Sequence, residues 1–197
     1  MRYFLLIFIM CLMLGCSEKP QTSDLVVHYT NPQIVKPFAL NDENGEIITE
    51  KSLHDQWTLL FLGYTSCPDI CPMTLAKLSQ VYQQLEKDYP VSVWFVSVDP
   101  QRDTPAKRQA YINYFDDEFR ALSGPHAQLF PFVRDIGLIY AINNSTEQEY
   151  YVDHSASVAL INPQGELAAI FKAKYTVNEI PLIDVHTLVR DFKIIAI

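Results

Sequence analysis

The sequence has few cysteines and no cluster of basic residues. Only four of its 197 residues are cysteine, and 15 Lys and Arg stand against 23 Asp and Glu, for a formal net charge of −8. An acidic chain without basic clusters argues against nucleic-acid binding. Cys11 and Cys16 lie near the N-terminus, so Cys67 and Cys71 are the only thiols in the bulk of the chain. Two thiols are too few for a disulfide framework.

A charge-free apolar run occupies residues 3–14, directly after Arg2. It is short for a bilayer span, which needs about 20 residues, and it fits a cleaved signal peptide. Met13-Leu14-Gly15-Cys16 resembles the bacterial lipoprotein signal, in which the cysteine becomes the lipidated first residue. We therefore expect a signal peptide over residues 1–15, a lipid on Cys16 and export to the periplasm or another extracytoplasmic space, with the protein anchored to a membrane. An uncleaved N-terminal anchor is the alternative.

The chain that follows the signal is long enough for one domain with a substantial core. Residues 16–36 are polar, contain Pro20 and Pro32, and show no convincing hydrophobic period. We interpret them as the lipidated N-terminus and a tether. A single domain is then expected over residues 37–197.

Two cysteines follow an apolar run that predicts a buried central strand, Trp57–Gly63. The segment after Pro72 has apolar residues at spacings of three and four, which predicts an amphipathic helix with proline in its first turn. Cys67 and Cys71 therefore flank a helix N-terminus, where free N–H groups and the helix dipole favour thiolate over thiol. Asp69 works against that shift.

Cysteines four residues apart can share one ion or, with some backbone adjustment, form a disulfide. A structural disulfide is therefore an alternative interpretation of Cys67 and Cys71. A loop this short gains little stability from a cross-link, because the stabilisation grows with loop length. The spacing favours a functional pair of thiols.

The remaining pattern predicts an α/β fold. A second core strand, Val91–Val98, is expected to run parallel to the first because a helix connects them. Thr104 and Pro105 begin the next helix, and residues 135–153 are hard to assign. A thioredoxin-like α/β sandwich with an N-terminal β-hairpin extension accounts for this order of elements, with the two thiols where the first core strand enters the first helix. The other expected elements are a hairpin at 37–40 and 46–49, a strand at 119–122, a helix at 127–134, antiparallel strands at 156–162 and 167–171, and a helix at 179–194.

Three motifs resemble the Sco/SenC family: FLGYTSCPDICP at 61–72, SVDPQRDTP at 97–105, and Asp153-His154-Ser155 ahead of LINPQG at 160–165. The resemblance extends from about residue 37 to the C-terminus. Members of this family are membrane-tethered, thioredoxin-fold copper proteins implicated in assembling the CuA centre of cytochrome c oxidase. The resemblance implies that Cys67, Cys71 and His154 are copper ligands.

The chemistry of these residue types agrees with that implication. Two thiolates and an imidazole are a soft donor set that suits Cu(I) and can also hold Cu(II), whereas zinc would usually take a fourth ligand or a water. Asp153 either orients a ligand or is an ordinary solvated carboxylate. Asp99, Arg102 and Asp103, from the second motif, are interpreted as a structural turn that also offers a partner surface.

Three functions are consistent with these motifs. The resemblance implies a membrane-tethered copper metallochaperone that delivers copper to the CuA-bearing subunit of cytochrome c oxidase, with periplasmic copper chaperones or thiol reductants as further partners. A thiol-disulfide reductase that keeps the oxidase's copper-ligand cysteines reduced is the alternative, and the sequence leaves open whether the protein is an enzyme. A peroxiredoxin-like or redox-sensing protein is disfavoured because Tyr64 stands where a threonine is expected. His154 favours a metal site, since disulfide exchange needs no third ligand.

Overall fold

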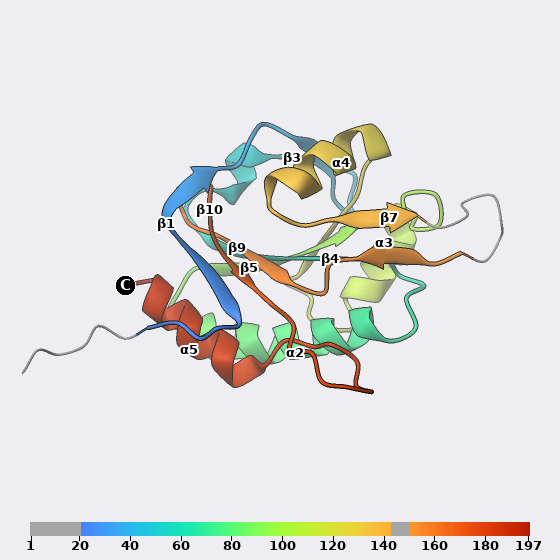
Figure 1. Cartoon of the computed structure of the whole chain (residues 1–197). Helices are drawn as coiled ribbons and strands as arrows, with labels where there is room; N and C mark the ends of the chain where they lie inside the picture. The colour runs from blue at the N-terminus through green and yellow to red at the C-terminus, as the bar shows by residue number, and fades with distance from the viewer. Residues whose placement is uncertain (1–20, 143–149) are drawn as a thin grey trace, which may run out of the picture.

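The computed structural model describes residues 21–142 and 150–197, so the expected signal peptide and Cys16 lie outside the described residues. Within them the chain forms a mixed α/β sandwich (Figure 1). In chain order its elements are β1 (Val26–Ile34), β2 (Ala39–Asn41), β3 (Ile47–Thr49), the 3₁₀ helix η1 (Glu50–Leu53), β4 (Trp57–Gly63), α2 (Ile70–Leu85), β5 (Val91–Ser97), α3 (Pro105–Ile112), β6 (Arg120–Leu122), α4 (His126–Asp135), β7 (Tyr140–Ile142), β8 (Val152–His154), β9 (Val158–Ile161), β10 (Glu166–Phe171) and α5 (Val185–Ile195).

The central sheet has the strand order β1-β10-β9-β4-β5-β6. Its middle strands, β4 and β5, are parallel and buried along almost their whole length, as the uninterrupted apolar runs predict for strands covered on both faces. β6 continues the parallel part, and β9, β10 and β1 form an antiparallel part. The carboxyl end of β4, where the cysteine loop begins, therefore lies in the middle of the sheet.

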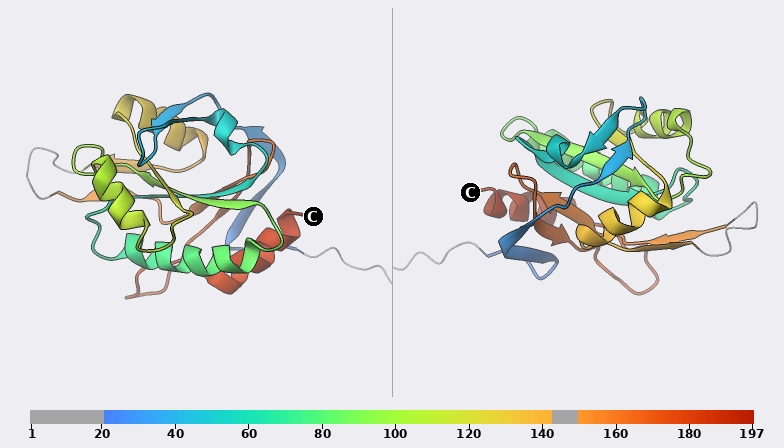
Figure 2. Two further views of the ribbon diagram at one scale, coloured as in Figure 1. Left: turned by 180° about the vertical axis from the view of Figure 1, so that it is seen from behind. Right: turned by 90° about the horizontal axis from the view of Figure 1, so that it is seen from above.

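Two hydrophobic clusters lie on opposite faces of the sheet. Leu60 and Leu62 of β4 point into one cluster, and Leu59 and Phe61 into the other, because successive strand side chains alternate between faces. Figures 1 and 2 show α2 and α5 on one face and α4 with the β2–β3 hairpin on the other. The prediction of an α/β sandwich with a hairpin ahead of it is confirmed.

The N-terminal segment differs from the prediction. Val26–Ile34, which the sequence analysis placed in the tether, forms β1 and pairs with the edge strand β10. Most residues of β1 are exposed, so main-chain hydrogen bonds rather than apolar burial hold it, and no hydrophobic period marks it. The carboxylate of Asp191 on α5 also accepts hydrogen bonds from the N–H and hydroxyl of Ser23 (3.0 and 2.6 Å). The ordered sheet therefore begins before residue 37.

Two further elements differ from the expected pattern. The closing helix begins at Val185 rather than at residue 179, because the side chain of Asp184 caps it by accepting from the N–H of Thr187 at 2.8 Å. Residues 135–153 include a small antiparallel ribbon, β7–β8, whose strands have three residues each. Strands that short leave no periodic signal. No helix of the described residues has the length and apolar character to cross a bilayer.

Candidate metal centre

The turn from β4 into α2 brings the two thiols together beyond the carboxyl end of β4, a middle strand of the sheet. Cys71 is the second residue of α2 and is fully buried, whereas Cys67 lies in the preceding loop and is partly exposed. Gly63, the last residue of β4, makes this packing feasible. A Cβ atom there would lie 2.8 Å from Cys71 Sγ and 2.6 Å from Phe95 Cε2. The absence of a side chain at this position gives Cys71 the space that it occupies.

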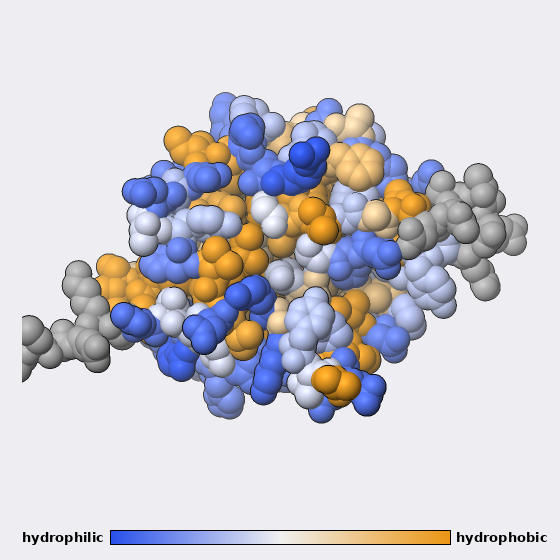
Figure 3. Space-filling model, in the orientation of Figure 1, coloured by the Kyte–Doolittle hydropathy of each residue, from blue (hydrophilic) through white to orange (hydrophobic). Residues whose placement is uncertain are grey.

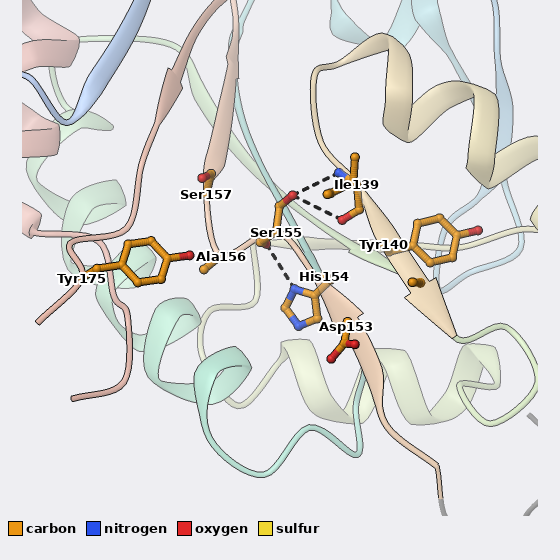
Figure 4. A pocket seen from close by; sticks show the side chains of 9 residues that line it. Ile139, Tyr140, Asp153, His154, Ser155, Ala156, Ser157 and Tyr175 are labelled. Carbon is orange, nitrogen blue, oxygen red and sulfur yellow. Dashed lines mark hydrogen bonds between the residues drawn. The ribbon is translucent and has the colours of Figure 1, made fainter. Parts of the chain in front are cut away.

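His154 reaches the thiols from the β7–β8 ribbon. It is the last residue of β8 and pairs with Tyr140, and the N–H of Ser155 donates to the carbonyl of Ile139 at 2.9 Å. His154 Nδ1 lies 3.1 Å from the carbonyl oxygen of Ser155, which can only accept, so Nδ1 carries the hydrogen (Figure 4). Nε2, on the opposite side of the ring, lies 3.3 Å from Cys71 Sγ. The contact to Ser155 thus turns the other ring nitrogen of His154 toward the thiols.

The donor atoms of Cys67, Cys71 and His154 all lie within 4.8 Å of one another. Atoms that bind one ion at about 2.0 to 2.3 Å are at most about 4.6 Å apart, so only a small movement separates this arrangement from a binding site. Within the part of the chain that the structure describes, these side chains are the one group of three or more Cys, His, Asp or Glu that meets this condition. The donor set, two sulfurs and one nitrogen, fits a soft metal ion.

The pKa values of the two thiols are shifted in opposite directions: that of Cys67 is lowered and that of Cys71 is raised. A hydrogen bond from the Cys71 thiol is the largest of the effects that lower the pKa of Cys67 to about 4, and His154 and the backbone N–H groups of Cys71 and Asp69 add to it. Burial raises the pKa of Cys71, and the neighbouring Cys67 raises it further. The effect expected of the helix N-terminus therefore appears only at Cys67, since burial outweighs it at Cys71. Cys67 is therefore the more acidic and partly exposed thiol, and Cys71 is the less acidic and buried one.

Aromatic rings surround the imidazole of His154. Phe61 and Tyr64 contact it edge to face, with ring centroids 5.8 and 6.1 Å away. Burial raises the pKa of Tyr64 to about 12, so its hydroxyl keeps its proton at neutral pH. These rings limit the rotation of His154 and exclude water from one side of the site.

A cleft of about 360 Å³ opens beside the thiols. It gives solvent and other molecules access to Cys67. Asp153 also lines it, and its carboxylate is exposed. Figure 4 shows Asp153 next to His154 on the same strand, and a role in orienting a ligand stays a prediction. The lining of the cleft includes Tyr64, Cys67, Asp69, Tyr151, His154 and Ile180.

Two acidic residues of the second motif are buried, although the sequence analysis interpreted them as part of a partner surface. Asp99 and Asp103 are each only 1% exposed, so that part of the interpretation is wrong. Asp103 accepts hydrogen bonds from the N–H and hydroxyl of Thr65, two residues before Cys67. The sequence signal for this support of the thiol loop was the position of charged residues directly after a buried strand. The residues that donate hydrogen bonds to them are distant in the chain.

The chain resembles known proteins in both sequence and fold. The SCO1/SenC family model matches residues 27–188. A SCO2-like protein of Rickettsia prowazekii is 33% identical over 172 residues, which cover 86% of this chain and 84% of that protein. The copper-bound structure of Arabidopsis thaliana ScoI has 31% identity and a TM-score of 0.69, and the match covers 83% of this chain and 98% of that one.

The copper-bound structure of Bradyrhizobium japonicum ScoI has 34% identity and a TM-score of 0.66, with 81% of this chain and 98% of that chain covered. The fold predicted from the sequence, a thioredoxin-like sandwich, is that of these Sco structures. With a family model that covers most of its length, the chain belongs to the SCO1/SenC family.

Proposed function

We propose that this protein is a copper metallochaperone, which binds one copper ion through Cys67, Cys71 and His154 and delivers it to the CuA-bearing subunit of cytochrome c oxidase. One observation carries the proposal: two sulfurs and an imidazole nitrogen converge within 4.8 Å at the edge of a surface cleft. The copper-bound structures of two ScoI relatives support copper as the metal.

The donor set suits a cargo ion that must be both held and released. Two thiolates and one imidazole match the preferences of Cu(I), and the nitrogen allows Cu(II) to be held as well. Cys67 is partly exposed at the cleft, so a thiolate of the receiving protein can approach the metal from that side. Transfer then proceeds by exchange of one ligand at a time, which favours a site with only three protein ligands.

The rim of the cleft offers apolar contacts to a protein partner. Tyr151 is 70% exposed and Ile180 is 40% exposed, and both line the cleft. Apolar side chains also reach the surface among polar ones on the face of the molecule seen in Figure 3. Exposed apolar residues beside polar ones are typical of interaction sites. This surface is suited to contact the receiving subunit, and other copper chaperones or thiol reductants are further candidates.

We also infer that the protein is exported and anchored to a membrane through lipid on Cys16. The apolar run at residues 3–14 and the sequence Met13-Leu14-Gly15-Cys16 support this inference. A lipid anchor would leave the copper site facing the periplasm or another extracytoplasmic space. That is the side on which a membrane oxidase would receive its CuA copper.

A thiol-disulfide reductase is the second candidate, and the unequal acidities of the thiols favour it. The partly exposed Cys67 thiolate would attack a disulfide of the receiving protein, which forms a mixed disulfide and frees one partner thiolate. Cys71, after losing its proton, would then attack the Cys67 sulfur, which forms a Cys67–Cys71 disulfide and frees the second partner thiol. A peroxidase has less support, because Thr65 is not available to orient peroxide: its hydroxyl donates to Asp103 at 2.6 Å.

Copper binding by the full chain, reduced and without oxygen, tests the proposal. Loss of a group that merely supports a ligand costs about 10- to 100-fold in metal affinity, so His154→Ala, which removes a ligand, should cost at least 100-fold. His186→Ala, on the exposed side of α5, is the matched control and should bind like wild type. Equal affinity of His154→Ala and wild type would contradict the site.

Mixing the copper-loaded or the metal-free protein with the soluble CuA domain of the oxidase distinguishes the two functions. Copper transfer from the loaded protein to the reduced domain supports the chaperone. Reduction of an oxidised domain by the metal-free protein, without copper transfer, supports the reductase.

A further inference from the structure

One loop of the fold contacts both of the segments that carry the proposed copper ligands. The loop runs from Ser97 at the end of β5 to Thr104 before α3. Cys67 and Cys71 lie between the end of β4 and the first turn of α2, and His154 ends β8, four residues before β9 begins. The pairing of β9 with β4 brings the two segments to one edge of the sheet, and the 97–104 loop adds contacts to each of them. The inference drawn from this loop rests on the proposed copper site.

The first contact holds the thiol segment through Asp103. Its buried carboxylate accepts hydrogen bonds from the N–H of Thr65 at 2.9 Å, from the Thr65 hydroxyl at 2.6 Å and from the Ser97 hydroxyl at 2.6 Å. The backbone of Asp103 is fixed in turn, because its carbonyl accepts from Arg108 at 2.9 Å and its N–H donates to Asp99. Thr65 is thus tied, two residues before Cys67, to a rigid acceptor.

The second contact holds the histidine segment through Asp99 and Arg102. The Tyr150 hydroxyl donates to Asp99 at 2.5 Å, and Arg102 Nη1 donates to the carbonyl of Tyr150 at 2.9 Å. Arg102 also forms an ion pair with Asp99, and its guanidinium lies 3.6 Å from the centre of the Tyr150 ring. Tyr150 comes two residues before β8, which ends at His154.

The two contacts form one continuous network. The Ser97 hydroxyl donates to Asp103 and accepts from the N–H of Asp99 at 3.3 Å. Both carboxylates are 1% exposed and fully engaged by donors, so removing a donor leaves a buried charge poorly paired. Hydrogen bonds to buried carboxylates are among the strongest in proteins, so they keep their geometry.

We propose that Asp103 and Tyr150 are positioning residues for the copper site. Through the 97–104 loop they set the distance between the thiol segment and the His154 segment. Neither residue touches the proposed donor atoms. Their contribution is to hold the sulfurs and the imidazole nitrogen at the separation that one ion needs.

The hydroxyl of Tyr150 provides the sharpest test. Tyr150→Phe removes its hydrogen bond to Asp99 but keeps the ring under Arg102, so the fold should be retained. Tyr140→Phe is the matched control, because it removes a hydroxyl of the same ribbon that bonds to His126 instead, at 2.8 Å. Asp103→Asn, which keeps size but loses charge and one acceptor oxygen, tests the other contact.

Copper titration of the full chain should give about 10-fold or weaker binding for Tyr150→Phe and Asp103→Asn, and wild-type binding for Tyr140→Phe. The thiolate-to-Cu(II) absorption band should shift in the first two proteins only. A lower unfolding temperature for Tyr150→Phe, with affinity and absorption unchanged, would show a merely structural role and would overturn the proposal.

A metal-free measurement separates this inference from the proposed function. Hydrogen exchange of the Ser155 N–H, which donates to Ile139, should be faster in Tyr150→Phe than in wild type or Tyr140→Phe. If wild type binds no copper, the proposed function fails. The exchange rate of the Ser155 N–H then still tests whether Tyr150 holds the His154 segment in place. Equal exchange in Tyr150→Phe and wild type would then overturn the inference.

Discussion

Replacing Gly63 by alanine should disturb both the core and the thiol pair. The new Cβ atom would lie 2.6 Å from Phe95 Cε2 and 2.8 Å from Cys71 Sγ, where about 3.5 Å or more is normal. Phe95 and Cys71 are fully buried, so each must retreat by somewhat less than 1 Å into a packed core. Cys71 cannot move without changing its distance to His154.

The cost follows from the packing. Inserting a methyl group into a well-packed core destabilises a protein by about 1–3 kcal/mol. For a chain of this size, each kcal/mol lowers the unfolding temperature by about 2–4 °C, so Gly63→Ala should lower it by about 2–12 °C. Copper affinity should also fall, by about 10-fold, because ligands must be held to within about 0.5 Å.

Gly124→Ala is the control for overpacking without an effect on the thiols. Its Cβ would lie 2.9 Å from Leu40 Cδ2, and Leu40 belongs to the cluster on the other face of the sheet. Thermal unfolding followed by circular dichroism should show a loss of stability for both variants. Copper titration should show a loss only for Gly63→Ala. Wild-type stability and affinity in Gly63→Ala would refute the reasoning that Cys71 needs the space above this glycine.

Two further predictions concern acidity and a buried cation. Because the pKa of Cys67 is lowered to about 4, its alkylation by iodoacetamide in the reduced, metal-free chain should be nearly independent of pH from about 6 to 8. Cys71→Ala removes the main cause, so the rate at Cys67, followed by peptide mass spectrometry, should then rise with pH; identical profiles would contradict the assignment. Arg108 is 4% exposed and donates to backbone carbonyls of three separate segments, so Arg108→Met should lower the free energy of unfolding by about 3 kcal/mol or more. Denaturant titration measures this free energy, and a loss below about 1 kcal/mol would contradict the prediction that Arg108 holds the three segments together.

The parts of the fold that the sequence predicted are those with a local signal. The runs at β4 and β5 are buried on both faces, and α2 has one apolar side, so composition and period indicate them directly. β1 and the β7–β8 ribbon have no such signal, since β1 is an exposed edge strand and the ribbon strands have three residues each. Main-chain pairing with distant segments, which leaves little trace in the sequence, determines these elements.

The site was predictable in its ligands but not in its support. Cys67 and Cys71 stand four residues apart at a strand-to-helix turn, whereas the approach of His154 was implied by the family resemblance alone. Asp99 and Asp103 were interpreted as a structural turn and partner surface because the sequence places no nucleophile for them to serve. Their burial depends on donors that are far away in sequence, so no local pattern could indicate it.

X-ray absorption at the copper edge tests the central claim most directly. In the full chain loaded with one equivalent of Cu(I), the account predicts two sulfur neighbours and one nitrogen neighbour, and loss of the nitrogen in His154→Ala. A Cys67→Ser/Cys71→Ser variant measures any copper held by the N-terminal cysteines. A sulfur-only shell in wild type, or a spectrum unchanged by His154→Ala, would contradict a site built from Cys67, Cys71 and His154.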